Sequence, residues 1–173
     1  MIYKATEVAA YVVKTAGDFG DDITPLRLQK ILYYIQGAFL ALKGEPAFSD
    51  EILAWKHGPA IHSVYSEYKK YGGDSIISNA NYSSISESDQ LFIKETYNRY
   101  RTFSTTQLIN KTHDEPPWAN STENDVITTE SIRSFFANIV YNENNLLSNI
   151  PLVTKLPNDM YDPSEDEEWS QYK

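Results

Sequence analysis

Histidines are the residues of this 173-residue chain best suited to acid–base chemistry or metal binding, and there are only three of them. The chain has no cysteine, which excludes thiolate catalysis, disulfide bonds and cysteine-based zinc sites. His57 and His62 are five residues apart. That spacing does not place both imidazoles on one helical face, as a His-x-x-x-His pair does. The sequence therefore gives little support to a metal site, and we expect no cofactor.

His113 is followed by Asp114, a pair that offers a base and an acid to orient it. Adjacent side chains diverge, however, and no serine lies in the Gly-x-Ser-x-Gly turn that exposes a nucleophile. We interpret His113 as the hydrogen-bonding partner of a backbone group, holding the rigid proline-rich loop 112–118 against the core. Neither glycine-rich phosphate-binding motif is present, so the sequence indicates no nucleotide site and no enzyme.

Most of the elements that must position the histidines are predicted to be helices, because their apolar residues recur at helical spacing. The clearest helix is segment 24–43, in which Thr24 can cap and Pro25 fits the first turn. Its apolar residues recur at helical spacing, at Leu28, Ile31, Leu32, Ile35, Phe39 and Leu42. Further helices are expected from about residue 6 to Gly17, from Pro59 to about 70, from Ser86 to about 103, from Ser104, and from Thr129 to about 140.

A small β element is predicted between the helices. Segment 51–56 is rich in large apolar residues and too short for a helix, and segment 75–77 can pair with it. The expected fold is mainly α, a single compact domain of about six helices with a two-stranded β element. Trp55 and Trp118 are interpreted as buried aromatics at the edges of this core, with a role as ligand platforms as the alternative.

Acidic residues outnumber basic ones by 24 to 15, which gives a net charge of -9. Such a chain repels phosphate backbones, so we expect a basic partner and no direct binding of nucleic acid. The first twenty residues lack the pattern of a signal peptide, and no run of 18 apolar residues occurs. We therefore expect a soluble cytoplasmic protein with no membrane partner.

Six of the acidic residues lie within positions 159–173. We divide the chain into a domain at 1–157 and an acidic, mobile tail at 158–173. Two interpretations of the tail stay open: it is simply solvated, or its acids and aromatics bind a basic, partly apolar groove of a partner. The residues of the second interpretation are Tyr161, Asp162, Glu165, Asp166, Glu167, Glu168, Trp169 and Tyr172.

Three stretches follow one another in a specific order. They are Leu-Arg-Leu-Gln-Lys-Ile-Leu-Tyr-Tyr at 26–34, Ala-Trp-Lys-His-Gly-Pro at 54–59 with Val-Tyr and Tyr-Gly after it, and Thr112-His113 before Pro117-Trp118. Together they resemble the Panacea domain family of antitoxins, which includes SocA-like and phage-associated GepA-like proteins. The resemblance extends over residues 5 to 140 and leaves out the tail.

This resemblance implies a mostly helical domain without enzymatic activity that neutralises a cognate toxin protein, often one that inhibits translation. One member of the family delivers its toxin to a AAA+ protease. The family's signature positions in this chain are interpreted as framework, and they do not identify the toxin-contact face. They are Leu28, Gln29, Tyr33, Trp55, Gly58, Pro59, His113, Pro117 and Trp118.

The leading hypothesis is therefore an antitoxin that covers a basic partner toxin by direct binding. One alternative is a proteolytic adaptor that hands a bound protein to a AAA+ protease through its exposed tail. Another is a phage-borne acidic inhibitor of a host or defence protein, whose complex high salt would weaken. The zinc-binding or helix-turn-helix segment of some family members is missing, so self-repression of an operon is not expected.

Overall fold

The computed structural model describes residues 1–143, and the tail at 158–173 lies outside them. The described part contains seven α-helices, one 3₁₀ turn and three short strands. The helices are α1 (Ala5–Phe19), α2 (Pro25–Leu42), α3 (His62–Tyr68), α4 (Glu87–Tyr100), α5 (Thr105–Asp114), α6 (Pro116–Ala119) and α7 (Thr129–Glu143). The strands are β1 (Ile52–Trp55), β2 (Gly58–Ala60) and β3 (Val126–Ile127), and the turn η1 is Lys69–Tyr71. The prediction of a mainly α domain with a small β element is confirmed.

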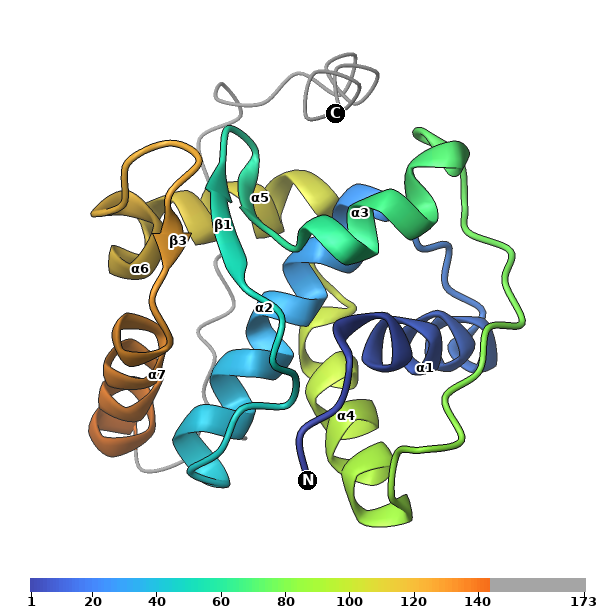
Figure 1. Cartoon of the computed structure of the whole chain (residues 1–173), viewed down its shortest axis with the longest axis horizontal. Helices are drawn as coiled ribbons and strands as arrows, with labels where there is room; N and C mark the ends of the chain where they lie inside the picture. The colour runs from blue at the N-terminus through green and yellow to red at the C-terminus, as the bar shows by residue number, and fades with distance from the viewer. Residues whose placement is uncertain (144–173) are drawn as a thin grey trace.

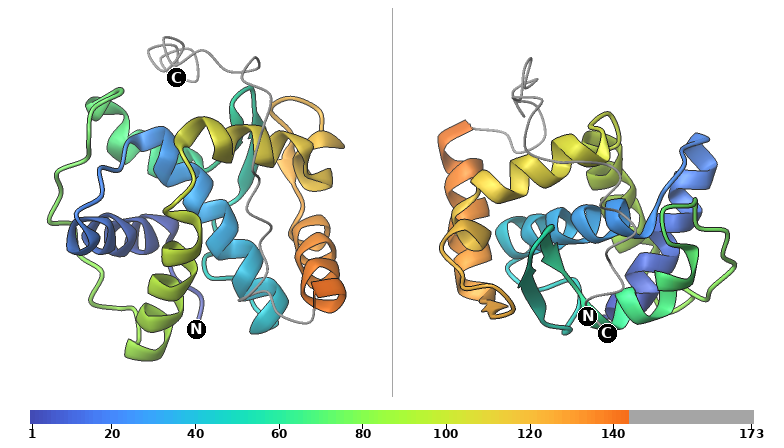
Figure 2. Two further views of the ribbon diagram at one scale, coloured as in Figure 1. Left: turned by 180° about the vertical axis from the view of Figure 1, so that it is seen from behind. Right: turned by 90° about the horizontal axis from the view of Figure 1, so that it is seen from above.

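Helix α2 is the centre of the fold, and the other elements surround it (Figure 1). Every residue from Pro25 to Leu40 is buried. Seen from above in Figure 2, α2 lies between the small sheet and α5. The predicted start is confirmed, because the Thr24 side chain accepts a hydrogen bond from the Arg27 amide and Pro25 opens the helix. The predicted apolar stripe ends earlier than expected, since Leu42 is exposed.

Polar side chains of α2 hold the segments packed around it. The Arg27 guanidinium donates to the carbonyls of Arg101 and Phe103, which follow α4, at 2.7 and 2.6 Å. The Gln36 amide donates to the carbonyl of Phe48 at 3.0 Å. Buried polar groups of this kind are stable only when their hydrogen bonds are made inside the protein. The amphipathic helix that the sequence predicts is therefore covered on its polar side as well.

The sheet differs from the two-stranded element predicted from segments 51–56 and 75–77. Its order is β2-β1-β3, and both pairs are antiparallel. Gly58 adopts a φ of 100° and reverses the chain directly after β1, so Gly58–Ala60 pairs with β1 and the next helix begins at His62 instead of Pro59. Ile76 instead donates its amide to the carbonyl of Ile23 at 2.9 Å, beyond the reach of β1.

Three helix boundaries also differ from the predictions. Helix α1 runs past Gly17 to Phe19, and Gly20 at a φ of 71° ends it. Segment 112–118 is not a continuous rigid loop: α5 extends to Asp114, and the two prolines open the short helix α6 as its first residues. This additional helix brings the number to seven. The predicted cap of α5 is confirmed as a full capping box between Ser104 and Gln107.

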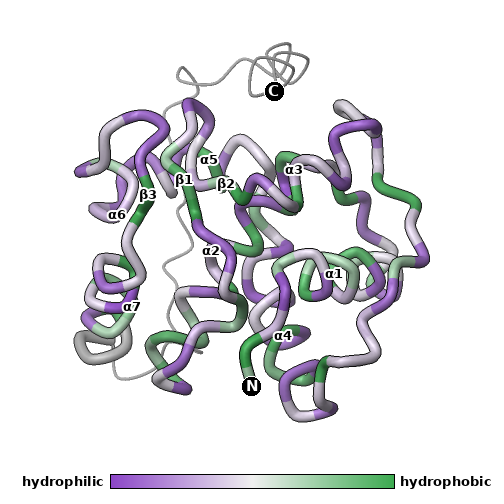
Figure 3. Tube along the Cα trace, viewed as in Figure 1, coloured by the Kyte–Doolittle hydropathy of each residue, from purple (hydrophilic) through white to green (hydrophobic). Residues whose placement is uncertain are grey.

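Hydropathy along the chain follows this arrangement (Figure 3). Hydrophilic residues gather at the tip between β1 and β2 and in the loop between α6 and β3, while β3 itself is hydrophobic. Within residues 1–143, no helix is long and apolar enough to cross a membrane.

Substituting Gly37 by alanine is expected to lower stability. A Cβ at Gly37 of α2 would lie 2.4 Å from the ring of Phe136 in α7, and that ring is fully buried in the core. The overpacking should cost about 1 to 3 kcal/mol, which exceeds the gain of up to about 1 kcal/mol in helix propensity. Gly17→Ala in α1, which meets no atom within 4 Å, is the matched control and should not destabilise. Urea unfolding of both variants tests this, and equal midpoints would contradict it.

Candidate functional site

The turn between β1 and β2 brings residues of three elements together. Gly58 occupies this turn, and a Cβ there would lie 2.8 Å from Thr112 Oγ1 and 3.0 Å from Lys30 Nζ. Glycine is therefore required at position 58 for two reasons: the positive φ of the turn, and the close approach of side chains from α5 and α2. Pro59 is buried, and its carbonyl accepts a hydrogen bond of 2.7 Å from Lys30.

Lys30 is the most deeply buried cationic group of this site. Its side chain is fully inaccessible to solvent, and burial holds the pKa of its ammonium well below its ordinary value. The neighbouring Gln29 also reaches the β2 segment: its amide accepts from the Ile61 amide at 2.8 Å and donates to the Ile61 carbonyl at 3.1 Å. Two consecutive side chains of α2 thus fix the path of the chain from β2 into α3.

His113 connects α5 with the hairpin and with α6. Its ring stacks on Trp118 with centroids 4.0 Å apart and an angle of 16°, and it is hydrogen-bonded to the backbone of Lys56. Burial, followed by the charges of Lys30 and His57, lowers the pKa of His113 to about 4. This is the backbone hydrogen bond predicted for His113 from the sequence, with the imidazole kept neutral near pH 7.

The indole of Trp118 completes this connection. Its Nε1 donates to the Trp55 carbonyl at 2.9 Å, so α6 is attached to β1. Trp55 is buried and meets the Tyr65 ring edge-on, whereas Trp118 is half-buried. Pro117 is buried in α6 beside it. Trp55 is therefore a core residue of the sheet, and Trp118 lies at the edge of the core.

Glu115 provides a buried carboxylate at the junction of α5 and α6. Tyr34 donates to its Oε1 at 3.0 Å, and the Lys111 ammonium lies 3.5 Å from the same oxygen. Burial raises the pKa of Glu115 to about 7, and Lys111 and the tyrosines only partly offset this. Tyr33 and Leu28, two further signature positions, are fully buried in the adjoining core. The acid therefore changes its charge near neutral pH.

The structure brings together two of the three histidines. His57 is buried at the hairpin near His113, while His62 is exposed at the start of α3 with its ring edge-on to Trp55. Within the described residues, no group of three or more histidine or acidic side chains is placed to hold a metal ion. The predicted tail residues, from Tyr161 to Tyr172, lie outside the residues that the structure describes.

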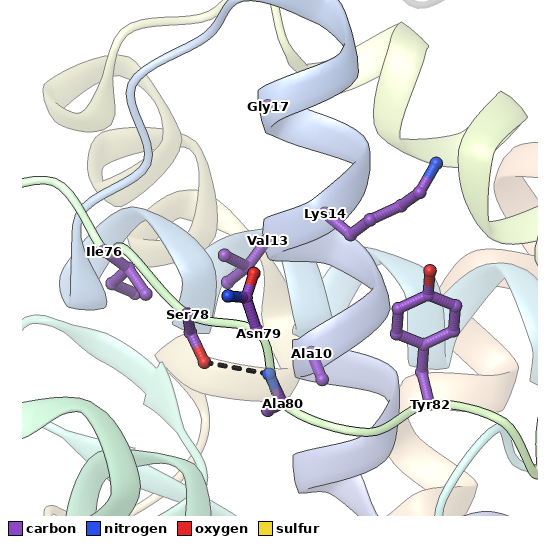
Figure 4. Close-up of a pocket in the computed structure, with 9 residues that line it drawn as sticks. All are labelled: Ala10, Val13, Lys14, Gly17, Ile76, Ser78, Asn79, Ala80 and Tyr82. Carbon is purple, nitrogen blue, oxygen red and sulfur yellow. Dashed lines mark hydrogen bonds between the residues drawn. The ribbon is translucent and has the colours of Figure 1, made fainter.

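A surface pocket of about 380 Å³ lies between α1 and the loop that follows η1 (Figure 4). Val13 and Lys14 line it from α1, and Ile76, Asn79 and Tyr82 line it from the loop. Lys14 is ion-paired with Asp18 one turn along the helix. The lining of the pocket contains no carboxylate or histidine, and its titratable groups are Lys14 and Tyr82.

Sequence reasoning did not assign a role to Lys30, Glu115 or Thr112. Lys30 is flanked in α2 by Leu28, Ile31 and Leu32, and that is the signal that could have identified it, because a lysine buried on all sides needs an internal acceptor. Glu115 directly precedes two prolines at the junction of α5 and α6. Nothing in the local sequence shows that Tyr34, far away along the chain, is its partner.

Comparison with known proteins identifies the family of this chain. The model of the family described as "Antitoxin SocA-like, Panacea domain" matches residues 28–119, and the chain belongs to this family. Antitoxin SocA of Caulobacter vibrioides (strain NA1000 / CB15N) is 37% identical over 76 residues, which are 44% of this chain. The alignment spans 40% of that relative's length. No solved structure matches the chain. The predicted resemblance to the Panacea domain is thus confirmed.

Proposed function

We propose that this protein is a cytoplasmic antitoxin that neutralises a partner toxin by binding it directly, without chemistry of its own. Membership of the SocA-like Panacea family over residues 28–119 is the observation that carries the proposal. The similarity to a protein named Antitoxin SocA supports the same role.

The positions of the chemically capable side chains support a binding role. His57 and Glu115 are buried, and His113 is occupied by Lys56 and Trp118. Neither the pocket beside α1 nor a second one beside α6 is lined by a histidine. These side chains make their contacts inside the domain, and this supports a role for the outer surface in binding a partner.

Charge favours a basic partner. The chain carries a net charge of -9, so its long-range field attracts cations and repels polyanions. A toxin that acts on RNA or on the translation machinery must present a basic surface to its target. Covering that surface would block the toxin without any reaction.

Co-expression with the product of the adjacent gene tests this function. We expect the toxin alone to arrest growth and the pair to grow, and the two proteins to elute together at low salt. A pair that elutes separately, with growth still arrested, would reject the antitoxin function.

The acidic tail supports delivery to a AAA+ protease as a second candidate function. Its acids and Trp169 lie outside the residues that the family model matches, and we propose that such a machine engages this segment. Removal of residues 158–173 separates the two mechanisms. Under simple occlusion, the truncated protein still binds the toxin and restores growth. Under delivery, the toxin stays bound but its half-life in the cell returns to that of the toxin alone.

A further inference from the structure

Strand β3 presents an unpaired edge within the part of the chain that the structure describes. It is the outer strand of the order β2-β1-β3. The Asp125 carbonyl accepts from the Ala54 amide of β1 at 2.9 Å, and Val126 stands opposite Leu53. Because alternate residues of an antiparallel strand direct their backbone groups to opposite sides, the N–H and C=O of Val126 face away from β1. One donor and one acceptor are thus offered to an added strand.

A groove of about 360 Å³ runs along this edge, between α6, β3 and the start of α7. Pro116 and Pro117 line it from α6, and Asp125, Val126 and Thr128 line it from the other wall. The Val126 side chain is 42% exposed, which is high for an apolar strand residue. The walls have a fixed spacing, because the indole N–H of Trp118 attaches α6 to β1, with which β3 pairs.

The surroundings of the groove are acidic. No lysine, arginine or histidine occurs between His113 and Arg133, whereas this stretch contains five acids. Asp114, Glu123, Asp125 and Glu130 among them are exposed. Among residues 1–143, no ion pair involves Glu123 or Asp125. In Figure 3, this hydrophilic loop stands directly beside the hydrophobic β3.

We propose that this groove binds a short, extended, basic segment of the partner protein, which pairs with the free edge of β3. The identification of the partner as a toxin rests on the proposed function. The segment's backbone bonds to Val126, an apolar side chain covers the exposed valine, and lysines or arginines reach Glu123 and Asp125. A second copy of the same acidic loop, or a nucleic acid, would be repelled by this charge.

A peptide probe tests the groove in the full chain. The probe is acetyl-Lys-Val-Lys-Val-Lys-amide, with acetyl-Glu-Val-Glu-Val-Glu-amide and a backbone N-methylated form of the first as matched controls. We expect the lysine peptide to shift the amide NMR signals of residues 118–131, and both controls to leave them unchanged. The binding should weaken with added salt.

Two variants separate the charge from the strand edge. Glu123→Gln with Asp125→Asn should weaken binding of the lysine peptide about fivefold to tenfold, since two exposed ion pairs are lost. Val126→Pro removes the outward N–H and leaves the hydrogen bonds with β1 in place. This variant should weaken binding of the lysine peptide about fivefold. Glu67→Gln on the exposed face of α3 is the control and should bind like the wild type.

The proposal is overturned if the peptide shifts gather on residues 76–82 instead, if no shifts occur, or if Val126→Pro binds as well as the wild type while retaining a folded NMR spectrum. This measurement contains no toxin, so its failure leaves the co-expression result untouched. Conversely, a peptide that binds as expected, together with no relief of growth arrest by the wild type, rejects the antitoxin function alone.

Discussion

Replacing Gly58 with alanine is expected to lower the free energy of unfolding by about 3 kcal/mol, the sum of two separate effects. The φ of 100° is strained for any residue with a Cβ. In addition, the new methyl group would lie 2.8 Å from Thr112 Oγ1 and 3.0 Å from Lys30 Nζ. Neither atom is free to move, because Thr112 donates to the Ile109 carbonyl and Lys30 donates to the Pro59 carbonyl.

Gly20→Ala is the matched control for the backbone effect. Gly20 has a φ of 71°, but a Cβ there would meet no atom within 4 Å. It should therefore lose only about 1 kcal/mol, the price of the left-handed conformation. Unfolding in urea, followed by circular dichroism, measures both changes. An equal loss in the two variants would show that the packing of Lys30 and Thr112 around the turn contributes nothing.

The elements that the sequence predicts well are those whose signals are local. The cap at Thr24, the proline at the start of α2 and the capping box at Ser104 involve residues within one turn of one another. The sheet was predicted with the wrong partner because pairing is not local. Segment 75–77 has residues typical of a strand, but the Ile76 amide donates to the Ile23 carbonyl instead. The true partner of β1, the three-residue strand that begins at Gly58, is too short to give a clear sequence signal.

In the candidate site, too, local features could be predicted from the sequence and long-range contacts could not. A backbone hydrogen bond for His113 could be predicted, since a lone histidine before a double proline has few other roles. The approach of Lys30 to the hairpin could not be predicted, because it depends on how β1 and β2 cross α2. The acidic groove beside β3 was also missed. Its charges are visible between His113 and Arg133, but only the pairing of Leu53 with Val126 shows that they border a free strand edge.

The framework residues and the proposed docking groove form one unit. Gly58 allows the hairpin to approach α5, and His113 and Trp118 then attach α5 and α6 to the hairpin backbone. Since β3 pairs with β1, the position of the groove walls depends on these contacts. Signature positions can therefore influence the shape of the proposed groove from within the core, as positioning residues do elsewhere.

Glu115 and His113 oppose each other in their effect on stability. Burial raises the pKa of Glu115 from 4.5 to about 7, so its contribution to stability is complete below pH 4.5 and is lost as the pH rises through 7. Burial lowers the pKa of His113 from 6.5 to about 4, so its contribution is present above pH 6.5 and is lost as the pH falls through 4. In the wild type, the stability lost from Glu115 as the pH rises is largely offset by the stability gained from His113 between pH 4.5 and 6.5.

Glu115→Gln should expose the effect of the Glu115 carboxyl on the pH dependence of the free energy of unfolding. The neutral amide can still accept the Tyr34 hydroxyl, but it has no proton to lose. The free energy of unfolding of this variant, relative to the wild type, should therefore rise by about 3 kcal/mol from pH 4 to pH 8. His113→Gln should change in the opposite direction, gaining on the wild type as the pH falls from 6.5 to 4. Urea unfolding at a series of pH values measures both differences, and flat curves for both variants would show that neither group is buried as the structure has it.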